Sequence, residues 1–141
     1  MSIDRILMRY HGAMKTSAKH LRATALLLLC LSACAVQHTP SQLVALPSSA
    51  PARTRTLVQE TEIKLDTGFV RSLKSGSTWQ QLGAIPDGEV YRPVKDVFTL
   101  EGANIHEAYL VVRGDLLVGF YLPAERGFSP MQVPVPLRFN H

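Results

Sequence analysis

Cysteine is scarce in this 141-residue chain, which has only two, at positions 30 and 34. A small domain stapled by disulfides needs more, so that class is excluded. The chain also lacks an apolar run of the ~20 residues that span a bilayer as a helix. Hydrophobic residues make up 46% and charged residues 18%, so a disordered polyelectrolyte is excluded as well. The length fits one domain, because a single core usually takes roughly 100–200 residues.

Most of the chain has no excess of positive charge. Five basic residues and one acidic residue precede Cys34, whereas the rest of the chain carries ten of each, so the formal charge of +4 belongs to the first segment. A domain that binds nucleic acid needs a basic face of its own. The sequence therefore predicts no nucleic-acid partner.

Groups that carry catalysis or bind metals are sparse after the second cysteine. His106 is followed by a glutamate, as at the start of the zinc-protease helix, but the second histidine of that motif is replaced by Leu110. The histidines in this part of the chain do not indicate a catalytic set, in which a histidine acts as a base beside a nucleophile and an orienting group. Glu60 and Glu62 share a predicted strand face, which we interpret as solvated rather than as a catalytic pair. We therefore expect no enzyme activity, no metal and no cofactor.

Residues 1–33 have the three-part order of a secretory signal peptide. Lysines and arginines between positions 15 and 22 precede an apolar run over residues 23–33, which ends in small residues. The basic part fits best if translation starts at Met14, with Met8 as another possible start. An uncleaved membrane anchor is the alternative, although the apolar run 23–36 is short for that role.

The end of the apolar run carries the most specific motif in the chain, Leu31-Ser32-Ala33-Cys34. It resembles the lipobox of bacterial lipoproteins, in which leucine, a small residue and then alanine or glycine precede a cysteine. The resemblance implies that a diacylglyceryl group is attached to the thiol of Cys34 and that a dedicated signal peptidase cuts after Ala33. Fatty acyl groups such as palmitate would then hold the chain to a membrane. A thiol suits this chemistry because its thiolate is a strong nucleophile near neutral pH.

Ala35 bears on the destination that the resemblance implies. Aspartate at this place retains lipoproteins of many Gram-negative bacteria in the inner membrane, so Ala35 implies the outer membrane, with the domain facing the periplasm. Two alternatives stay open. An ordinary signal peptidase that cuts at Ala33-Cys34-Ala35 would release a soluble periplasmic protein, and Cys30 is a second candidate for modification, although bulky leucines precede it.

Residues 34–55 are predicted to be a flexible tether. They contain Pro40, Pro47 and Pro51 among serines and threonines, and this composition disfavours a helix or a central strand. A flexible segment of about 20 residues spans roughly 25 Å, which would hold a folded domain clear of the lipid headgroups. The alternative is that residues 43–46 dock on the domain or on a partner.

Residues 56–141 are predicted to form an all-β domain, a small barrel or sandwich of about six or seven short antiparallel strands. The strongest signal is a hairpin whose strands, 106–112 and 116–122, are almost continuously apolar. Apolar runs without alternation indicate burial on both faces, so we expect this hairpin at the centre of the fold. Gly114 between the strands supplies the positive φ that a short hairpin loop needs.

Further strands are expected over residues 56–65, 68–74, 79–85, 89–92, 97–100 and 131–139. Residues 78–82 form a short helix capped by Ser77 in the alternative interpretation. In the last range, Pro134 and Pro136 place their missing N–H groups on the same side of the strand. That side cannot pair, which predicts an edge strand protected against edge-to-edge association.

A candidate partner-binding surface comes from the loop over residues 123–130, which presents Arg126 and Phe128 between two prolines. An arginine beside an aromatic residue is a common contact pair, and we expect Trp79 and Tyr91 near it. The competing interpretation is that Phe128 and Trp79 fill the core, because a small domain needs its aromatic residues there.

Together these features predict an outer-membrane lipoprotein whose β-domain is a non-catalytic accessory or binding module of the cell envelope. Its partners would be the membrane, through the lipid anchor, and an envelope protein. An envelope enzyme that acts on cell-wall material and a soluble periplasmic ligand-binding protein are the alternatives.

Overall fold

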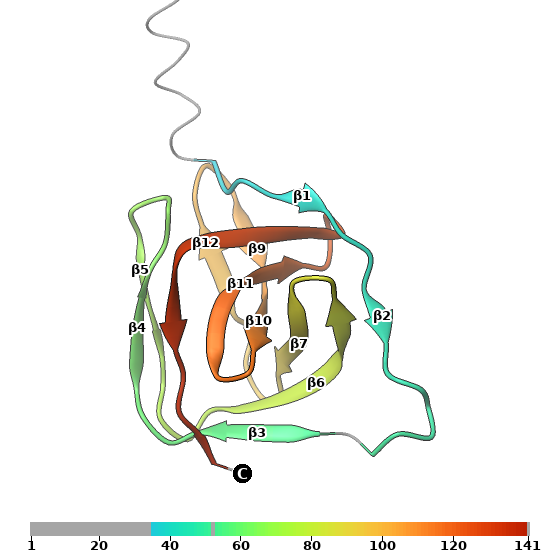
Figure 1. The fold of residues 1–141 in the computed structure, drawn as a ribbon. Helices are drawn as coiled ribbons and strands as arrows, with labels where there is room; N and C mark the ends of the chain where they lie inside the picture. Colours follow the sequence, from blue (N-terminus) through green and yellow to red (C-terminus); the bar gives the residue numbers. More distant parts are fainter. Residues whose placement is uncertain (1–34, 52, 141) are drawn as a thin grey trace, which may run out of the picture. The chain divides into compact units, whose positions relative to one another are not determined.

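The computed structural model describes residues 35–51 and 53–140 (Figure 1). All the elements of regular secondary structure within these residues are β-strands. The predicted all-β, antiparallel class is confirmed. There are 13 strands in three sheets. This is more than expected, because the strands predicted over residues 56–65, 106–112 and 131–139 are each divided in two and the predicted tether contributes two of its own. The largest sheet is an open path of strands, with β1 and β13 at its two ends.

The largest sheet contains nine strands. Their order is β1 (Thr39–Pro40), β12 (Gly127–Pro136), β11 (Leu116–Leu122), β10 (Tyr109–Arg113), β7 (Gly88–Pro93), β6 (Thr78–Ile85), β3 (Thr54–Leu57) and β13 (Phe139–Asn140), with β2 (Val44–Ala45) paired to the end of β6. The predicted central hairpin is confirmed, because β10 and β11 lie between β7 and β12. Gly114 in its turn has a φ of 64°.

Residues of β10 alternate between two hydrophobic clusters, which explains why this strand is apolar throughout. Leu110 and Val112 are fully buried in the larger cluster, while Val111 is fully buried in the smaller one. In the larger cluster, Trp79 and Phe98 meet edge to face with ring centroids 5.9 Å apart. The smaller cluster consists of Ile85, Val90, Val111, Tyr121 and Phe128.

Residues 78–85 form β6 rather than the alternative short helix. Every second residue from Trp79 to Ile85 is buried, and this alternation is typical of a strand with one face on a core. The turn that follows ends at Gly88, where β7 begins, as the sequence predicts.

The predicted strand over residues 56–65 is divided in two. β3 ends at Leu57 and belongs to the largest sheet, whereas β4 (Thr61–Lys64) pairs only with β5 (Val70–Leu73). The N–H of Val58 donates to the carbonyl of Arg138 at 2.9 Å, so the chain is held beside β13 before it turns away.

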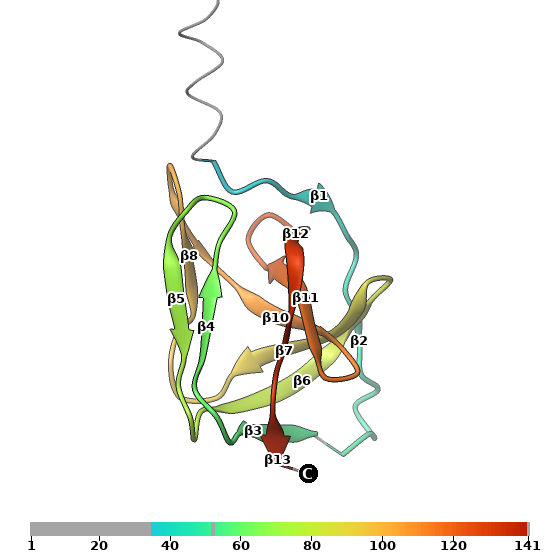
Figure 2. The ribbon, with the colours of Figure 1, turned by 60° about the vertical axis from the view of Figure 1, so that its left-hand side comes forward.

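The third sheet is another hairpin, formed by β8 (Thr99–Glu101) and β9 (Ile105–Glu107). It is bound to the β4–β5 hairpin, because Thr67 donates to the carbonyl of Glu101 at 2.8 Å. Figures 1 and 2 show the two hairpins side by side at the margin of the largest sheet.

The N-terminal part of the described chain, residues 35–51, lies on the β-domain as an ordered strap. The prediction of a flexible tether is wrong for these residues, and the docking alternative describes them. β1 pairs with the start of β12, and β2 pairs with the end of β6. The N–H of Leu46 adds a 2.9 Å bond to the carbonyl of Leu82. Leu43 packs against the smaller cluster, so the strap shields that face of the sheet from water, which favours docking over a free chain.

The edge strand predicted over residues 131–139 is confirmed for residues 131–136 of β12, which lie beside β11 on one side, whereas Phe139 belongs to β13 and pairs with β3. The N–H of Leu137 donates to the carbonyl of Asp115 at 2.7 Å. Because successive N–H groups alternate in direction along a strand, the nitrogens of Pro134 and Pro136 point away from β11. The outer side of β12 is thus blocked against a further strand, as expected from the sequence.

Candidate functional site

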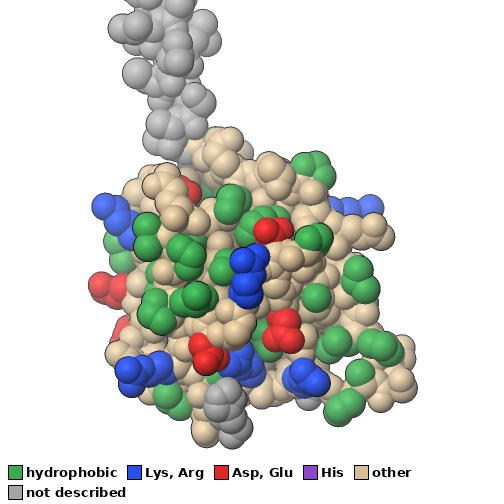
Figure 3. All heavy atoms as spheres, in the orientation of Figure 1, with side chains coloured by type: hydrophobic (Ala, Val, Ile, Leu, Met, Phe, Trp, Pro, Cys, Tyr) green, Lys and Arg blue, Asp and Glu red, His purple; other side chains and the backbone are tan. Residues whose placement is uncertain are grey.

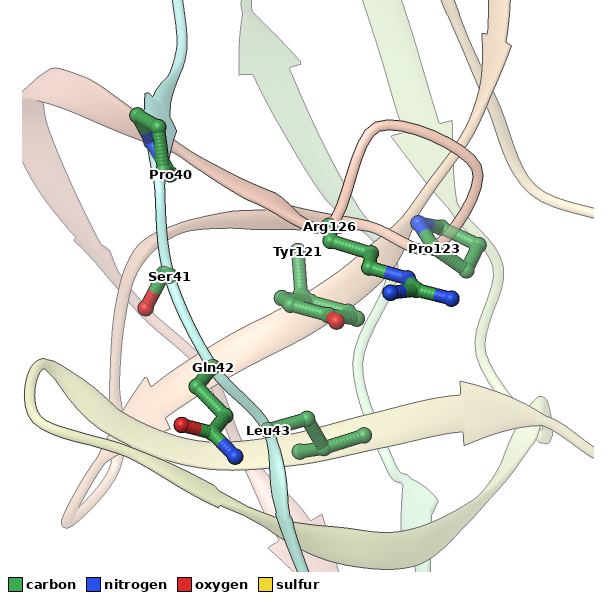
Figure 4. Close-up of a pocket in the computed structure, with 7 residues that line it drawn as sticks. All are labelled: Pro40, Ser41, Gln42, Leu43, Tyr121, Pro123 and Arg126. Carbon is green, nitrogen blue, oxygen red and sulfur yellow. The ribbon is translucent and has the colours of Figure 1, made fainter.

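A pocket beside the sequence-predicted site residue Arg126 lies between the strap and the β11–β12 loop (Figure 4). It has a volume of about 560 Å³. Its lining comes from two separate parts of the chain: Pro40, Ser41, Gln42 and Leu43 from the strap, and Tyr121, Pro123 and Arg126 from β11 and its loop. We call this the strap pocket.

Arg126 owes its position to an unusual backbone conformation. Its φ is 50°, the only positive φ among the described non-glycine residues. A left-handed conformation costs an L-residue about 1–2 kcal/mol. The neighbouring strap holds it there, because the carbonyl of Arg126 accepts a hydrogen bond from the N–H of Ser41 at 2.9 Å. Strain of this kind concentrates at functional sites, which marks Arg126 as a candidate binding residue.

The strap pocket combines an apolar floor with polar groups at its rim. Tyr121 is only 5% exposed and packs in the smaller hydrophobic cluster together with Leu43. Figure 4 shows the guanidinium group of Arg126 on one side of the Tyr121 ring and the side chains of Ser41 and Gln42 on the other. Arg126 takes part in none of the ion pairs found among the described residues, so its five N–H donors can face a ligand.

Three of the four predicted partner-binding residues belong to the core instead of a surface. The exposed fractions of Phe128, Trp79 and Tyr91 are 7%, 3% and 2%, and Phe128 lies in a different cluster from the other two. Burial, followed by the hydrogen bond that Tyr91 donates to Glu89 at 2.7 Å, raises the pKa of Tyr91 to about 12. Their assignment to a contact surface is corrected, and the interpretation that aromatics fill this small core is the one the structure supports. Arg126 is the exposed member of the set.

The loop that presents Arg126 is fixed by a contact that sequence patterns do not show. Glu125 Oε1 lies 2.5 Å from Nδ1 of His106, 19 residues earlier in the chain. This hydrogen bond, aided by the nearby His38, holds the pKa of Glu125 below its usual value of 4.5 against the opposing effect of burial. In residues 35–51 and 53–140, no cluster of three histidine, cysteine, aspartate or glutamate side chains is arranged to hold a metal ion.

A second cavity of about 540 Å³ lies between the turn that joins β5 to β6 and residues 93–98. Arg71 and Lys74 line it together with Trp79 and Phe98. Arg71 is already paired with Glu101 at 3.0 Å, so a cationic group in this cavity is occupied within the fold.

Charge on the surface is mixed. On the face drawn in Figure 3, basic and acidic side chains are interspersed between hydrophobic ones. The residues of the lipobox motif, Leu31-Ser32-Ala33-Cys34, lie outside the described residues. Within the described ranges there is no helix of the length and apolar character needed to cross a membrane.

Comparison of the chain with protein-family models, with curated proteins and with solved structures finds no match in any of the three.

Proposed function

We propose that this chain is a lipid-anchored protein of the bacterial outer membrane whose β-domain faces the periplasm and binds an envelope protein without catalysing a reaction. The observation that carries the proposal is the Leu31-Ser32-Ala33-Cys34 motif behind a basic and then apolar leader. This order is the signature of an exported and anchored chain. Two or three acyl chains bury enough methylene groups, at ~0.8 kcal/mol each, to make such an anchor stable.

The strap pocket supports a binding role. An unpaired guanidinium beside an aromatic ring recognises a carboxylate through two parallel hydrogen bonds while the ring covers apolar parts of the ligand. The chemistry of the pocket thus favours an acidic segment of a partner protein. An anchor confines such a module to a surface layer, where even a weak contact gains from the high local concentration.

The soluble periplasmic ligand-binding protein is a second candidate, and one observation favours it. The volume of the strap pocket, about 560 Å³, falls in the range of roughly 300–1,000 Å³ typical of small-molecule sites. That candidate requires cleavage that discards Cys34. A test of the anchor therefore separates the two.

The anchor is tested by intact mass and fractionation of the native protein. We expect a mature chain that begins at Cys34 and carries a diacylglyceryl group and fatty acyl groups. Cys34→Ser abolishes the modification and moves the protein out of the membrane fraction, whereas the matched control Cys30→Ser leaves both unchanged. An unmodified chain that begins after Cys34, or membrane fractionation that Cys34→Ser leaves unaltered, overturns the proposal.

The partner-binding role is tested by photocrosslinking in intact cells. A benzoylphenylalanine placed at the exposed Gln42 reports contacts at the strap pocket, and one placed at Val94, which is 50% exposed elsewhere on the domain, serves as the control. We expect a defined adduct from position 42 that Arg126→Gln reduces severalfold. An adduct of equal yield at both positions, or one that Arg126→Gln does not change, contradicts a role for this pocket.

A further inference from the structure

The chain enters the described β-domain at one particular end. Figures 1 and 2 both place the blue start of the described chain beside the tips of two hairpins, the turn between β4 and β5 and the turn between β8 and β9. The strand β13 lies at the opposite end in both views. We call the end formed by residues 35–36, 66–70 and 102–105 the anchor-proximal end.

Few residues separate this end from the proposed anchor at Cys34. Val36 packs against the larger hydrophobic cluster, and a trans peptide separates successive Cα atoms by ~3.8 Å. Two peptide units join Cys34 to Val36, so at most about 8 Å of backbone separates the proposed anchor from the packed domain. The roughly 20 residues that a free tether would supply are used by the strap, which pairs with β12 and β6 instead.

The two hairpin tips are held together as one rigid surface. The hydroxyl of Thr67 donates to the carbonyl of Glu101 at 2.8 Å, and the guanidinium of Arg71 reaches the carboxylate of Glu101 at 3.0 Å. Within the β4–β5 turn, the N–H of Leu65 donates to the carbonyl of Phe69 at 2.8 Å. A surface fixed by these bonds keeps its shape when it meets a partner.

This rigid end exposes large apolar side chains. The exposed fraction is 49% for Phe69, 58% for Val70 and 72% for Ile105. Single exposed apolar residues are ordinary, but three on adjoining hairpin tips beside the point where the chain enters form a surface that water solvates poorly. Asp66 is the one charged residue within the ranges that form this end, and Lys64, of opposite charge, pairs with Val70 just outside them. Attraction to a membrane would thus come from apolar contact and depend little on lipid charge.

We propose that the anchor-proximal end docks on the lipid surface that holds Cys34, with Phe69, Val70 and Ile105 among the headgroups. This inference rests on the lipid anchor proposed above. The headgroup layer of each leaflet is about 5–8 Å thick, close to the ~8 Å of backbone that joins Cys34 to Val36, so an acylated Cys34 keeps this end of the domain next to the headgroups. The domain is thereby oriented end-on, with β13 pointing away from the bilayer.

The test uses the lipidated chain reconstituted in phosphatidylcholine vesicles. The mature chain has no thiol apart from the modified Cys34, so a single introduced cysteine carries a fluorophore without interference. Probes go to Val70→Cys and Ala103→Cys at the anchor-proximal end and to Asn140→Cys at the opposite end. We expect lipids with a nitroxide on the headgroup to quench the first two at least severalfold more than the third.

The outcomes separate the two proposals. If the chain carries lipid and floats with the vesicles but all three probes are quenched alike, the docked orientation is wrong and the anchor stands. If the chain carries no lipid by intact mass and does not float, the anchor itself fails and the docking inference falls with it.

A paired variant tests whether the apolar tips make the contact. Phe69→Ser combined with Ile105→Ser removes two exposed side chains, and near-ultraviolet circular dichroism checks that the core is intact. Each loss lowers the ratio of docked to undocked domains by about tenfold, so quenching of the Ala103→Cys probe falls. The control Val94→Ser removes an exposed valine elsewhere and leaves the quenching unchanged. Unaltered quenching in the paired variant overturns the proposed contact.

Discussion

His106 and Glu125 join two parts of the fold that are distant in sequence, with Nδ1 of the imidazole 2.5 Å from Oε1 of the carboxylate. His106 belongs to β9, and Glu125 lies in the β11–β12 loop directly before Arg126. The contact therefore braces the loop that forms one wall of the strap pocket. It also connects that loop to the hairpin whose tip belongs to the anchor-proximal end.

Glu125→Gln is expected to destabilise the domain in a pH-dependent way. The pKa of Glu125 is held below 4.5 by the hydrogen bond with His106, so the folded state gives up this proton at a lower pH than the unfolded chain does. The carboxylate therefore stabilises the fold above the unfolded pKa, and that contribution is lost as the pH falls through the folded pKa. Urea unfolding at pH 7 should show a loss of about 1 kcal/mol, and the gap to the wild type should narrow as the pH falls below 4.5 and close once it passes the lowered pKa of the folded state.

The exposed Glu62 is the control for this substitution. Glu62→Gln removes a carboxylate that makes no side-chain hydrogen bond among the described residues, so its free energy of unfolding at pH 7 should equal that of the wild type. If Glu125→Gln lost the same stability at every pH, its effect would come from packing and not from the ionised carboxylate.

Local patterns in the sequence predict the hairpins of the largest sheet. Gly114 and Gly88 mark turns between apolar strands, and such signals act over a few residues, which makes them readable from the chain alone. The paired prolines at 134 and 136 correctly indicate an edge because the lost donor is a property of the residue itself.

The strap and the strap pocket could not be predicted in this way. The composition of residues 35–51 is typical of a linker, and what orders it is pairing with β6 and β12, strands far along the chain. Arg126 stands out in the sequence as a charged residue in a short loop. Two further features of the site depend on contacts between distant segments, for which one sequence gives no signal. They are the opposite wall of the pocket, at Ser41 and Gln42, and the hydrogen bond of Glu125 with His106.

Gly83→Ala is expected to detach the strap while leaving the core folded. A Cβ atom at position 83 would lie 2.1 Å from the carbonyl oxygen of Val44 and 2.9 Å from the Cα of Ala45. β2 pairs with β6 through two residues only, so the strap yields before the sheet does. Limited proteolysis should cut within residues 41–51 at least tenfold faster than in the wild type, a ratio that corresponds to about 1.4 kcal/mol of lost local protection.

Gly76→Ala provides a matched control for the strap. Gly76 has a φ of 80° with nothing within 4 Å of an added Cβ, so alanine there strains the backbone by about 1 kcal/mol without touching the strap. We expect lower overall stability and an unchanged rate of cleavage in the strap. Equal protection of the strap in Gly83→Ala and the wild type would contradict the pairing of β2 with β6.

Arg55 is expected to contribute to stability mainly through aromatic contact and little through its ion pair. Its guanidinium lies 2.5 Å from Asp115, but that side chain is 63% exposed, and exposed pairs contribute little. The same group sits 4.0 Å from the centre of the Phe139 ring and 5.8 Å from that of Tyr91. Urea unfolding should show a loss of about 1–2 kcal/mol for Arg55→Ala and under ~0.5 kcal/mol for Asp115→Asn. Comparable losses in the free energy of unfolding for the two variants would show that the ion pair, and not the aromatic contact, accounts for the contribution of Arg55.

Arg126→Gly is expected to stabilise the domain and to weaken binding at the strap pocket. Glycine adopts a φ of 50° without the penalty that an L-residue pays, so the free energy of unfolding should rise by about 1 kcal/mol. The guanidinium is lost at the same time, and the adduct from a crosslinker at Gln42 should fall as it does for Arg126→Gln. Arg126→Gln keeps the strained backbone and serves as the comparison, since it should lose the adduct without gaining stability. If Arg126 lowers stability through its strained backbone and its removal weakens binding, the strain serves the binding of a ligand. A glycine variant with higher stability and an undiminished adduct would contradict a binding role for Arg126.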